Sequence, residues 1–197
     1  MKMIFKRYKK KYMVKLFNYN LFSMRLFLTL IFLFVSSCSG KMNIEKFKGQ
    51  QPEFSLEDYF MGKTQAWGMF HDRFGNLKRT FKVDIIGTLE SDKLLLNEKF
   101  IYDDGEEDVR VWTIKILGNN KYIGTASDVV GEATGVAKGN ALNWKYKLNL
   151  KVGNSTILVD FDDWMFLQDR NILMNRAEVK KWGVNIGVVS ITFLKIN

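Results

Sequence analysis

Two charged residues, Glu98 and Arg110, occupy positions where the sequence pattern predicts apolar side chains. Alternate residues are apolar on either side of the turn 103–105, over 94–102 and over 110–116. Alternation of this kind indicates strands with one buried face, and Asp-Gly between two such runs indicates a hairpin. An acid and a base on a buried face could contact a ligand, transfer a proton, or hold the strands in register.

The register of this hairpin decides whether the two charges face each other. The alternating positions are even-numbered on both strands, so facing residues must add up to an even number and the loop must be odd. A three-residue loop, Asp103-Asp104-Gly105, meets this condition with glycine in the left-handed conformation, and it places Glu98 opposite Arg110. Such a pair contributes about 0.2–1 kcal/mol, and losing one partner on a buried face costs about 3–5 kcal/mol. A two-residue loop would separate the charges onto opposite faces.

Further polar residues follow apolar residues on other expected strands. Asp128 comes after Tyr122, Asp163 comes after Phe161, and Asn175 follows Leu173, each at an even spacing. If these side chains point inward, they form a polar cluster with aromatic walls, which is the general form of a small-molecule pocket. The predicted ligand-binding residues are Glu98, Arg110, Trp112, Asp128, Trp144, Tyr146, Asp163, Trp164 and Asn175.

The same cluster has a structural alternative, an internal network that fixes strand register and binds nothing, and such networks are the more common outcome. Catalysis is the weaker interpretation. Glu98 and Asp163 could act as acid and base, but no catalytic residue is assigned. His71 is the only histidine and is expected to be a solvated strand residue. Because no clustered cysteine and histidine spacing occurs, neither a metal nor a cofactor is expected.

The expected fold class is all-β. About nine strands follow one another with short turns, which favours an antiparallel up-and-down meander that closes into a lipocalin-like β-barrel. A two-sheet sandwich is the alternative. Ser55, three residues before Asp58, predicts a short N-terminal helix. Residues 128–140 are rich in glycine and alanine, where a strand would bend or let another group approach closely.

The N-terminal segment has the features of an export signal. Residues 1–37 hold eight of the thirty basic residues and no acidic one. Ten apolar or small residues, 26–35, precede Ser36 and Ser37, which is the pattern of a secretory signal peptide and is too short for a membrane-spanning helix of about 20 residues. Translation that starts at Met24 instead of Met1 would give a more compact signal.

The tetrad Val35-Ser36-Ser37-Cys38 resembles a bacterial lipobox. The resemblance implies that Cys38, the only cysteine, is acylated and becomes the first residue of the mature chain. Ser39 stands where an aspartate would favour the inner membrane, so the expected location is the outer membrane, facing the periplasm. A buried thiol beside an uncleaved anchor helix is the alternative. The predicted domains are a signal peptide (1–37), a lipidated tether (38–53) and a barrel domain (54–197).

Beyond residue 37 the charges almost balance, with 22 basic residues against all 21 acidic ones. Nucleic acids attract proteins through clustered positive charge. No nucleic-acid partner is therefore expected, and the predicted partners are a membrane, through acylated Cys38, and a small lipid-like ligand.

A series of short motifs runs in order along residues 55–195: 66–70 (AWGMF), 72–75 (DRFG), 98–106 (EKFIYDDGE), 110–112 (RVW), 124–126 (GTA), 128–131 (DVVG), 139–141 (GNA), 162–165 (DDWM), 175–177 (NRA) and 181–184 (KWGV). In this order they resemble the domain-of-unknown-function family 3833, a set of Gram-negative bacterial lipoproteins. Trp182 departs from the phenylalanine expected there. The resemblance implies export, lipidation and a compact β domain, and it assigns no catalytic residue.

These observations favour an envelope lipoprotein whose barrel binds a small apolar or amphipathic ligand, such as a fatty acyl group. One alternative is a non-catalytic envelope protein that binds a protein partner. The lower-ranked alternative is an enzyme that acts on a lipid-like substrate through its interior carboxylates.

Overall fold

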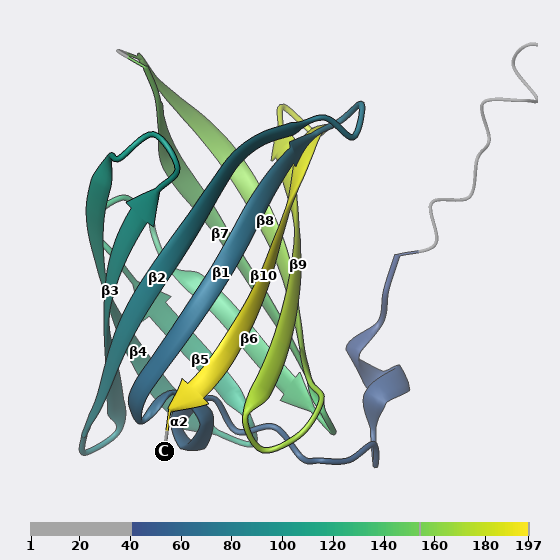
Figure 1. Ribbon diagram of the computed structural model, residues 1–197. Coiled ribbons are helices and arrows are strands. Elements are labelled where there is room, and N and C mark those ends of the chain that lie inside the picture. The colour runs from purple at the N-terminus through teal and green to yellow at the C-terminus, as the bar shows by residue number, and fades with distance from the viewer. Residues whose placement is uncertain (1–40, 154, 197) are drawn as a thin grey trace, which may run out of the picture. The chain divides into compact units, whose positions relative to one another are not determined.

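The computed structural model describes residues 41–153 and 155–196, so the predicted signal peptide and Cys38 lie outside the described residues. Within this range ten antiparallel strands follow one another and close into a barrel, because β1 also pairs with β10 (Figure 1). The predicted all-β up-and-down barrel is confirmed and the sandwich is excluded. The strands are β1 (Gly62–Asp72), β2 (Leu77–Glu90), β3 (Lys93–Tyr102), β4 (Glu107–Gly118), β5 (Lys121–Thr125), β6 (Ala133–Lys138), β7 (Ala141–Val152), β8 (Ser155–Leu167), β9 (Ile172–Lys181) and β10 (Val184–Ile196).

The hairpin of β3 and β4 has the predicted register. Glu98 faces Arg110 across the two strands. Gly105 takes a φ of 84° in the loop, and the Tyr102 N–H donates to the Glu106 carbonyl at 2.9 Å. Loop length and glycine position therefore set the pairing, as expected for a local turn.

Strand β6 accounts for the difference between ten strands and the nine expected. Its inward residues are all small: Ala133, Gly135 and Ala137. The indole of Trp144, on β7, lies over this strand and over β5, so that a Cβ at Gly135 would overlap the ring and one at Gly124 would come within 2.6 Å of it. The glycines thus make room for the indole, and the strand lacks the large apolar alternation by which strands are recognised.

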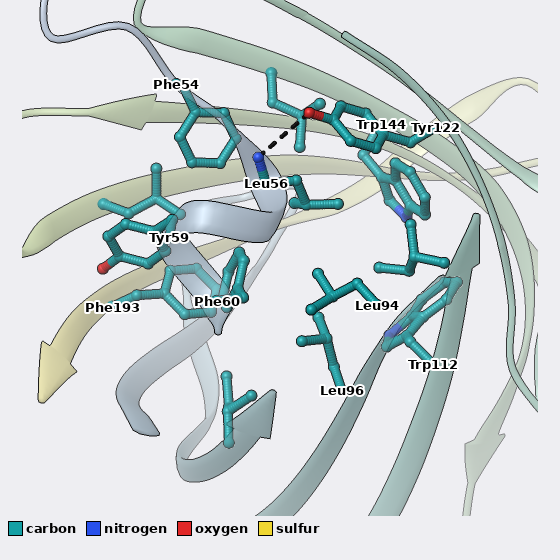
Figure 2. Close-up of a cluster of buried hydrophobic side chains, with 14 of the residues drawn as sticks. Phe54, Leu56, Tyr59, Phe60, Leu94, Leu96, Trp112, Tyr122, Trp144 and Phe193 are labelled. Carbon is teal, nitrogen blue, oxygen red and sulfur yellow. Dashed lines mark hydrogen bonds between the residues drawn. The ribbon is translucent and has the colours of Figure 1, made fainter. Parts of the chain in front are cut away.

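A short helix, α2 (Leu56–Phe60), closes one end of the barrel, which confirms the predicted helix. The Ser55 side chain caps it by accepting from the Asp58 N–H at 3.2 Å. Figure 2 shows Leu56 and Phe60 among buried side chains of the barrel wall. Gly87 lies beneath the helix, where any Cβ would overlap the Phe60 carbonyl. The apolar face of α2 therefore completes the core at this end.

Two side chains of the barrel hold α2 in place. The Tyr122 hydroxyl accepts from the Leu56 N–H at 3.4 Å (Figure 2). The same hydroxyl donates to Glu57 Oε2 at 2.9 Å. Lys195 Nζ donates to three carbonyl oxygens at the other end of the helix, those of Asp58, Tyr59 and Met61. A cation is favourable there because the last carbonyls of a helix lack backbone partners.

The 3-10 helix η1 (Ile44–Phe47) lies within the segment predicted to be a tether. The Phe47 ring packs against Trp164 and Phe166, with centroid distances of 5.9 and 5.4 Å. This part of the segment therefore covers the outside of the barrel wall. Across residues 41–153 and 155–196, no helix is long and apolar enough to span a membrane.

Candidate functional site

The barrel encloses a cavity of about 580 Å³. Leu56 and Phe60 of α2 bound it at the closed end. Lys78, Asp104 and Lys151 line it near the opposite end, which carries the β1–β2 and β3–β4 turns (Figure 1). The side chains of Lys78 and Asp104 are 54% and 60% exposed, so the cavity reaches solvent there. Pockets for small ligands usually measure about 300–1,000 Å³, so this space is large enough for one.

Most of the cavity wall is apolar. Every second residue of the long strands points inward, as the pleat of a strand requires. Eight of the ten strands, all except β5 and β6, contribute aliphatic or aromatic side chains. Representative residues are Val83, Phe100, Ile114, Leu148, Val179 and Ile191. The wall therefore favours an apolar molecule or the apolar part of an amphipathic one.

Polar side chains interrupt this wall, and Arg110 is the centre of the first group. Its guanidinium donates to both Asp128 oxygens, with the shortest contact at 2.7 Å. Glu98, the residue opposite it, is farther away at 4.0 Å. The side chains of Arg110 and Glu98 are only 20% and 14% exposed. Glu98, Arg110 and Asp128 thus form a triad of charged residues, in which Asp128 lies closer to Arg110 than Glu98 does.

Burial and the charge of Arg110 have opposite effects on the pKa of Glu98. Burial raises the pKa of Glu98 to about 7, against the lowering effect of the Arg110 charge. Burial alone would lower the pKa of Arg110, but Glu98 and Asp128 raise it above the usual value. Arg110 therefore stays charged at neutral pH, while the carboxyl group of Glu98 changes its protonation state near pH 7.

Asp163 and Asn175 form the second group, with side chains from β7, β8 and β9. The Tyr146 hydroxyl donates to Asp163 Oδ2 at 3.2 Å, and Asn175 Nδ2 donates to the Trp164 carbonyl at 3.4 Å. Asp163 and Asn175 are 7% and 5% exposed. Burial raises the pKa of Asp163 to about 7, although the hydrogen bond from the Tyr146 hydroxyl opposes the shift.

Trp112 lies on β4, two residues after Arg110, and its indole packs against the second group. Its ring lies edge-on to Tyr146 at 5.5 Å and to Trp144 at 5.7 Å. Together the two groups form a polar layer, which we define as Glu98, Arg110, Asp128, Tyr146, Asp163 and Asn175. The layer contains three carboxyl groups and one guanidinium, so acidic groups outnumber basic groups within it.

Seven of the nine predicted ligand-binding residues line the cavity, all except Asp128 and Trp164. The inward placement of Trp164 is wrong, because it follows Asp163 on the same strand and neighbours on a strand point to opposite faces. Trp164 lies on the outside, stacked with Phe166 and covered by Phe47. Whether the seven residues bind a ligand stays a prediction.

The predicted strand position of Asp128 is also wrong. Strand β5 ends at Thr125, and Asp128 lies in the connection to β6. Its backbone carbonyl accepts from the Asn149 N–H at 2.8 Å, which holds the connection along β7. From there the carboxylate reaches Arg110, so Asp128 joins the polar layer from a loop.

Arg79 is not among the predicted ligand-binding residues, but it lines the cavity near the open end. Its guanidinium lies 3.6 Å from the centroid of the Tyr102 ring and pairs with Asp104 and Glu106 of the β3–β4 turn. The signal was present in the sequence, since Arg79 shares the odd-numbered, inward register of Val83 on β2. In the part of the chain that the structure describes, no three acidic, histidine or cysteine residues gather to hold a metal ion.

Two solved structures share this barrel fold. One is the S-type phycobiliprotein lyase CPES from Guillardia theta, at 11% identity and a TM-score of 0.53, over 80% of this chain and 95% of that one. The other is a protein of unknown function from the DUF3598 family of Nostoc punctiforme, at 12% identity and a TM-score of 0.55. That match covers 75% of this chain but only 51% of the other.

Among curated proteins, none matches this chain in sequence. The model of a family described as "Protein of unknown function (DUF3833)" matches residues 32–195, which is most of the chain. This agrees with the motifs found along residues 55–195. The chain therefore belongs to the DUF3833 family.

Proposed function

We propose that the barrel binds one small apolar or amphipathic molecule, such as a fatty acyl group, inside its cavity. The observation that carries this proposal is a cavity of about 580 Å³ with apolar walls and one layer of convergent polar groups. This combination is typical of small-molecule sites. The fold shared with a phycobiliprotein lyase is in line with a ligand-binding barrel. Because α2 closes one end, the ligand would enter from the end that carries the β3–β4 turn.

A fragment of residues 41–197 is the suitable material for a test. Every strand and α2 lie within it, and the buried core begins at Phe54. The residues from Asn43 onward also form one compact unit. The fragment therefore contains all that closes the barrel and omits Cys38, the proposed site of acylation.

Native mass spectrometry of this fragment with added bacterial lipid extract tests the proposal. We expect one bound apolar molecule per chain. The variant Ala177→Trp, which fills the cavity from β9, should lose most of the bound mass. The matched control Arg176→Trp changes the neighbouring residue, whose side chain is 52% exposed, and should keep the ligand. Equal ligand loading of both variants would rule out binding inside the barrel.

We further propose that the protein is an outer-membrane lipoprotein that faces the periplasm, anchored through acylated Cys38. The support is the lipobox-like tetrad that ends at Cys38 after an apolar run. Cells expressing the full-length chain and fed an alkyne-tagged palmitate should incorporate the label into this protein, and Cys38→Ser should abolish labelling. Labelling of the Cys38→Ser chain, or recovery of the unmodified wild-type chain in the soluble fraction, would contradict anchoring at this residue.

A partner protein is the second candidate, favoured by two exposed aromatic side chains. Trp182, in the β9–β10 turn, is 89% exposed, and Phe74, in the β1–β2 turn, is 75% exposed. Trp182 also takes a φ of 52°, a left-handed conformation that is uncommon for a bulky residue. Contact with another protein would cover such residues. A barrel without ligand in the native spectra, together with weaker capture of a cross-linked partner by Trp182→Ser, would favour this candidate.

An enzyme acting on a lipid-like substrate ranks third. Glu98 and Asp163 have raised pKa values near 7, which acid–base catalysis needs. Burial, however, is the largest cause in both cases, so a buried binding site produces the same effect. Recovery of a chemically altered lipid from the wild-type fragment, but not from Asp163→Asn, would favour catalysis.

A further inference from the structure

Two oxygen atoms in the polar layer have no hydrogen-bond partner among the residues that the structure describes. They are Asp163 Oδ1 and Asn175 Oδ1, and both are buried. Their side chains line the cavity and are 7% and 5% exposed. Buried polar atoms in folded proteins are nearly always paired. Two unpaired acceptors on neighbouring strands therefore indicate a place where a donor from another molecule belongs.

The guanidinium of Arg110, the only cation of the polar layer, is already paired with acidic side chains. Arg110 donates three hydrogen bonds to Asp128, and Glu98 lies 4.0 Å from its guanidinium. A ligand carboxylate would have to displace Asp128 and would add a fourth acid to a layer with one guanidinium. Like charges in a buried space repel strongly. The layer is therefore poorly suited to an anionic head group.

We propose that the polar layer selects an amphipathic ligand with a neutral hydroxyl head group. Each hydroxyl donates its hydrogen to one of the two acceptors, Asp163 Oδ1 or Asn175 Oδ1, while the hydrocarbon tail lies along the apolar wall. This inference rests on the proposed function and narrows its ligand class. A long-chain alcohol and a monoacylglycerol both have this chemistry, and the second also carries a fatty acyl chain. A free fatty acid in its ionised form is not a ligand of this kind.

Competition for the cavity by three probes of equal chain length tests the selection. Dodecanol, dodecanoate and dodecane would each displace N-phenyl-1-naphthylamine from the fragment 41–197 at pH 8, where dodecanoate is ionised. We expect dodecanol to bind about tenfold more tightly than either of the others, since each hydrogen bond to a buried acceptor has a modest net effect.

Asn175→Leu is the first variant, because leucine has a similar size and removes one unpaired acceptor. The affinity for dodecanol should fall toward that of dodecane, while the affinity for dodecane should stay the same. Asn149→Leu is the matched control, since Asn149 lies on a strand but is exposed, and it should bind all three probes like the wild type. Asp163→Asn is a second variant, which should reduce the discrimination against dodecanoate because it removes one negative charge.

The outcomes separate this inference from the proposed function. If the wild-type fragment binds dodecanoate more tightly than dodecanol, or binds dodecanol and dodecane equally, the selection of a hydroxyl head group is wrong and the barrel still binds apolar molecules. If neither the fluorescent probe nor any of the three compounds binds, the proposed function itself is wrong.

Discussion

Replacement of Arg110 by methionine should lower the free energy of unfolding by about 3–5 kcal/mol, the typical effect of removing one partner from a buried ion pair. Methionine keeps much of the side-chain volume, so the loss comes from the charge. Without the guanidinium, the Asp128 carboxylate loses three hydrogen bonds, and Glu98 loses the charge that opposes the rise of its pKa. Urea denaturation of the fragment 41–197 at pH 7, followed by circular dichroism, measures the change.

Lys99→Met is the matched control on the same hairpin. Lys99 pairs with Glu107 at 3.0 Å, but the two side chains are 51% and 57% exposed. A surface pair of this kind contributes about 0–1 kcal/mol, so the control should be nearly neutral. Glu98→Gln in the Arg110→Met background should recover part of the loss, because it removes one uncompensated acid. If Arg110→Met were no more destabilising than Lys99→Met, the triad would not stabilise the barrel.

The stability of the barrel should fall as the pH rises from about 4 to about 7, which is opposite to the usual behaviour of paired carboxylates. The pKa of Asp163 rises from 3.8 to about 7 on folding, and that of Glu98 from 4.5 to about 7. Between these limits the folded chain holds protons that the unfolded chain has released. Stability must therefore decrease with pH across this window and level off above it, with a total loss of roughly 8 kcal/mol for two groups with shifts of this size.

The double variant Glu98→Gln, Asp163→Asn isolates this effect, since neither amide titrates. Its free energy of unfolding, from urea curves between pH 4 and pH 8, should lose the downward slope that the wild type shows. Hydrogen bonding from Asn76 lowers the pKa of Asp72 to about 2, so the contribution of Asp72 falls below this window. A wild-type slope that is flat or rising between pH 4 and pH 7 would contradict raised pKa values in the polar layer.

The features that the sequence determined are local ones. The register of the β3–β4 hairpin follows from the parity of two alternating runs and from the place of Gly105, which takes the required positive φ. Helix α2 follows from its Ser55 cap and one apolar face. The inward direction of Glu98, Asp163 and Asn175 follows from alternation along each strand. In each case the cause lies within a few residues of the effect, so the sequence alone is sufficient.

The tertiary structure decided what depends on residues far apart in the chain. Strand β6 exists without large apolar residues because Trp144, from the next strand, fills the space above its glycine. Trp164 is covered on the outside by Phe47, which is more than a hundred positions away. Asp128 becomes the closer partner of Arg110 because a loop, not a strand, carries it there.

The cavity that carries the proposed function also depends on residues far apart in the chain. Alternation indicates which side chains point inward, but the space that they leave depends on how residues from all ten strands and α2 pack together. The polar layer likewise draws on β3, β4, β7, β8, β9 and the loop before β6. The sequence therefore determined the charged residues of the wall, while barrel closure decided that they meet beside an open cavity of about 580 Å³.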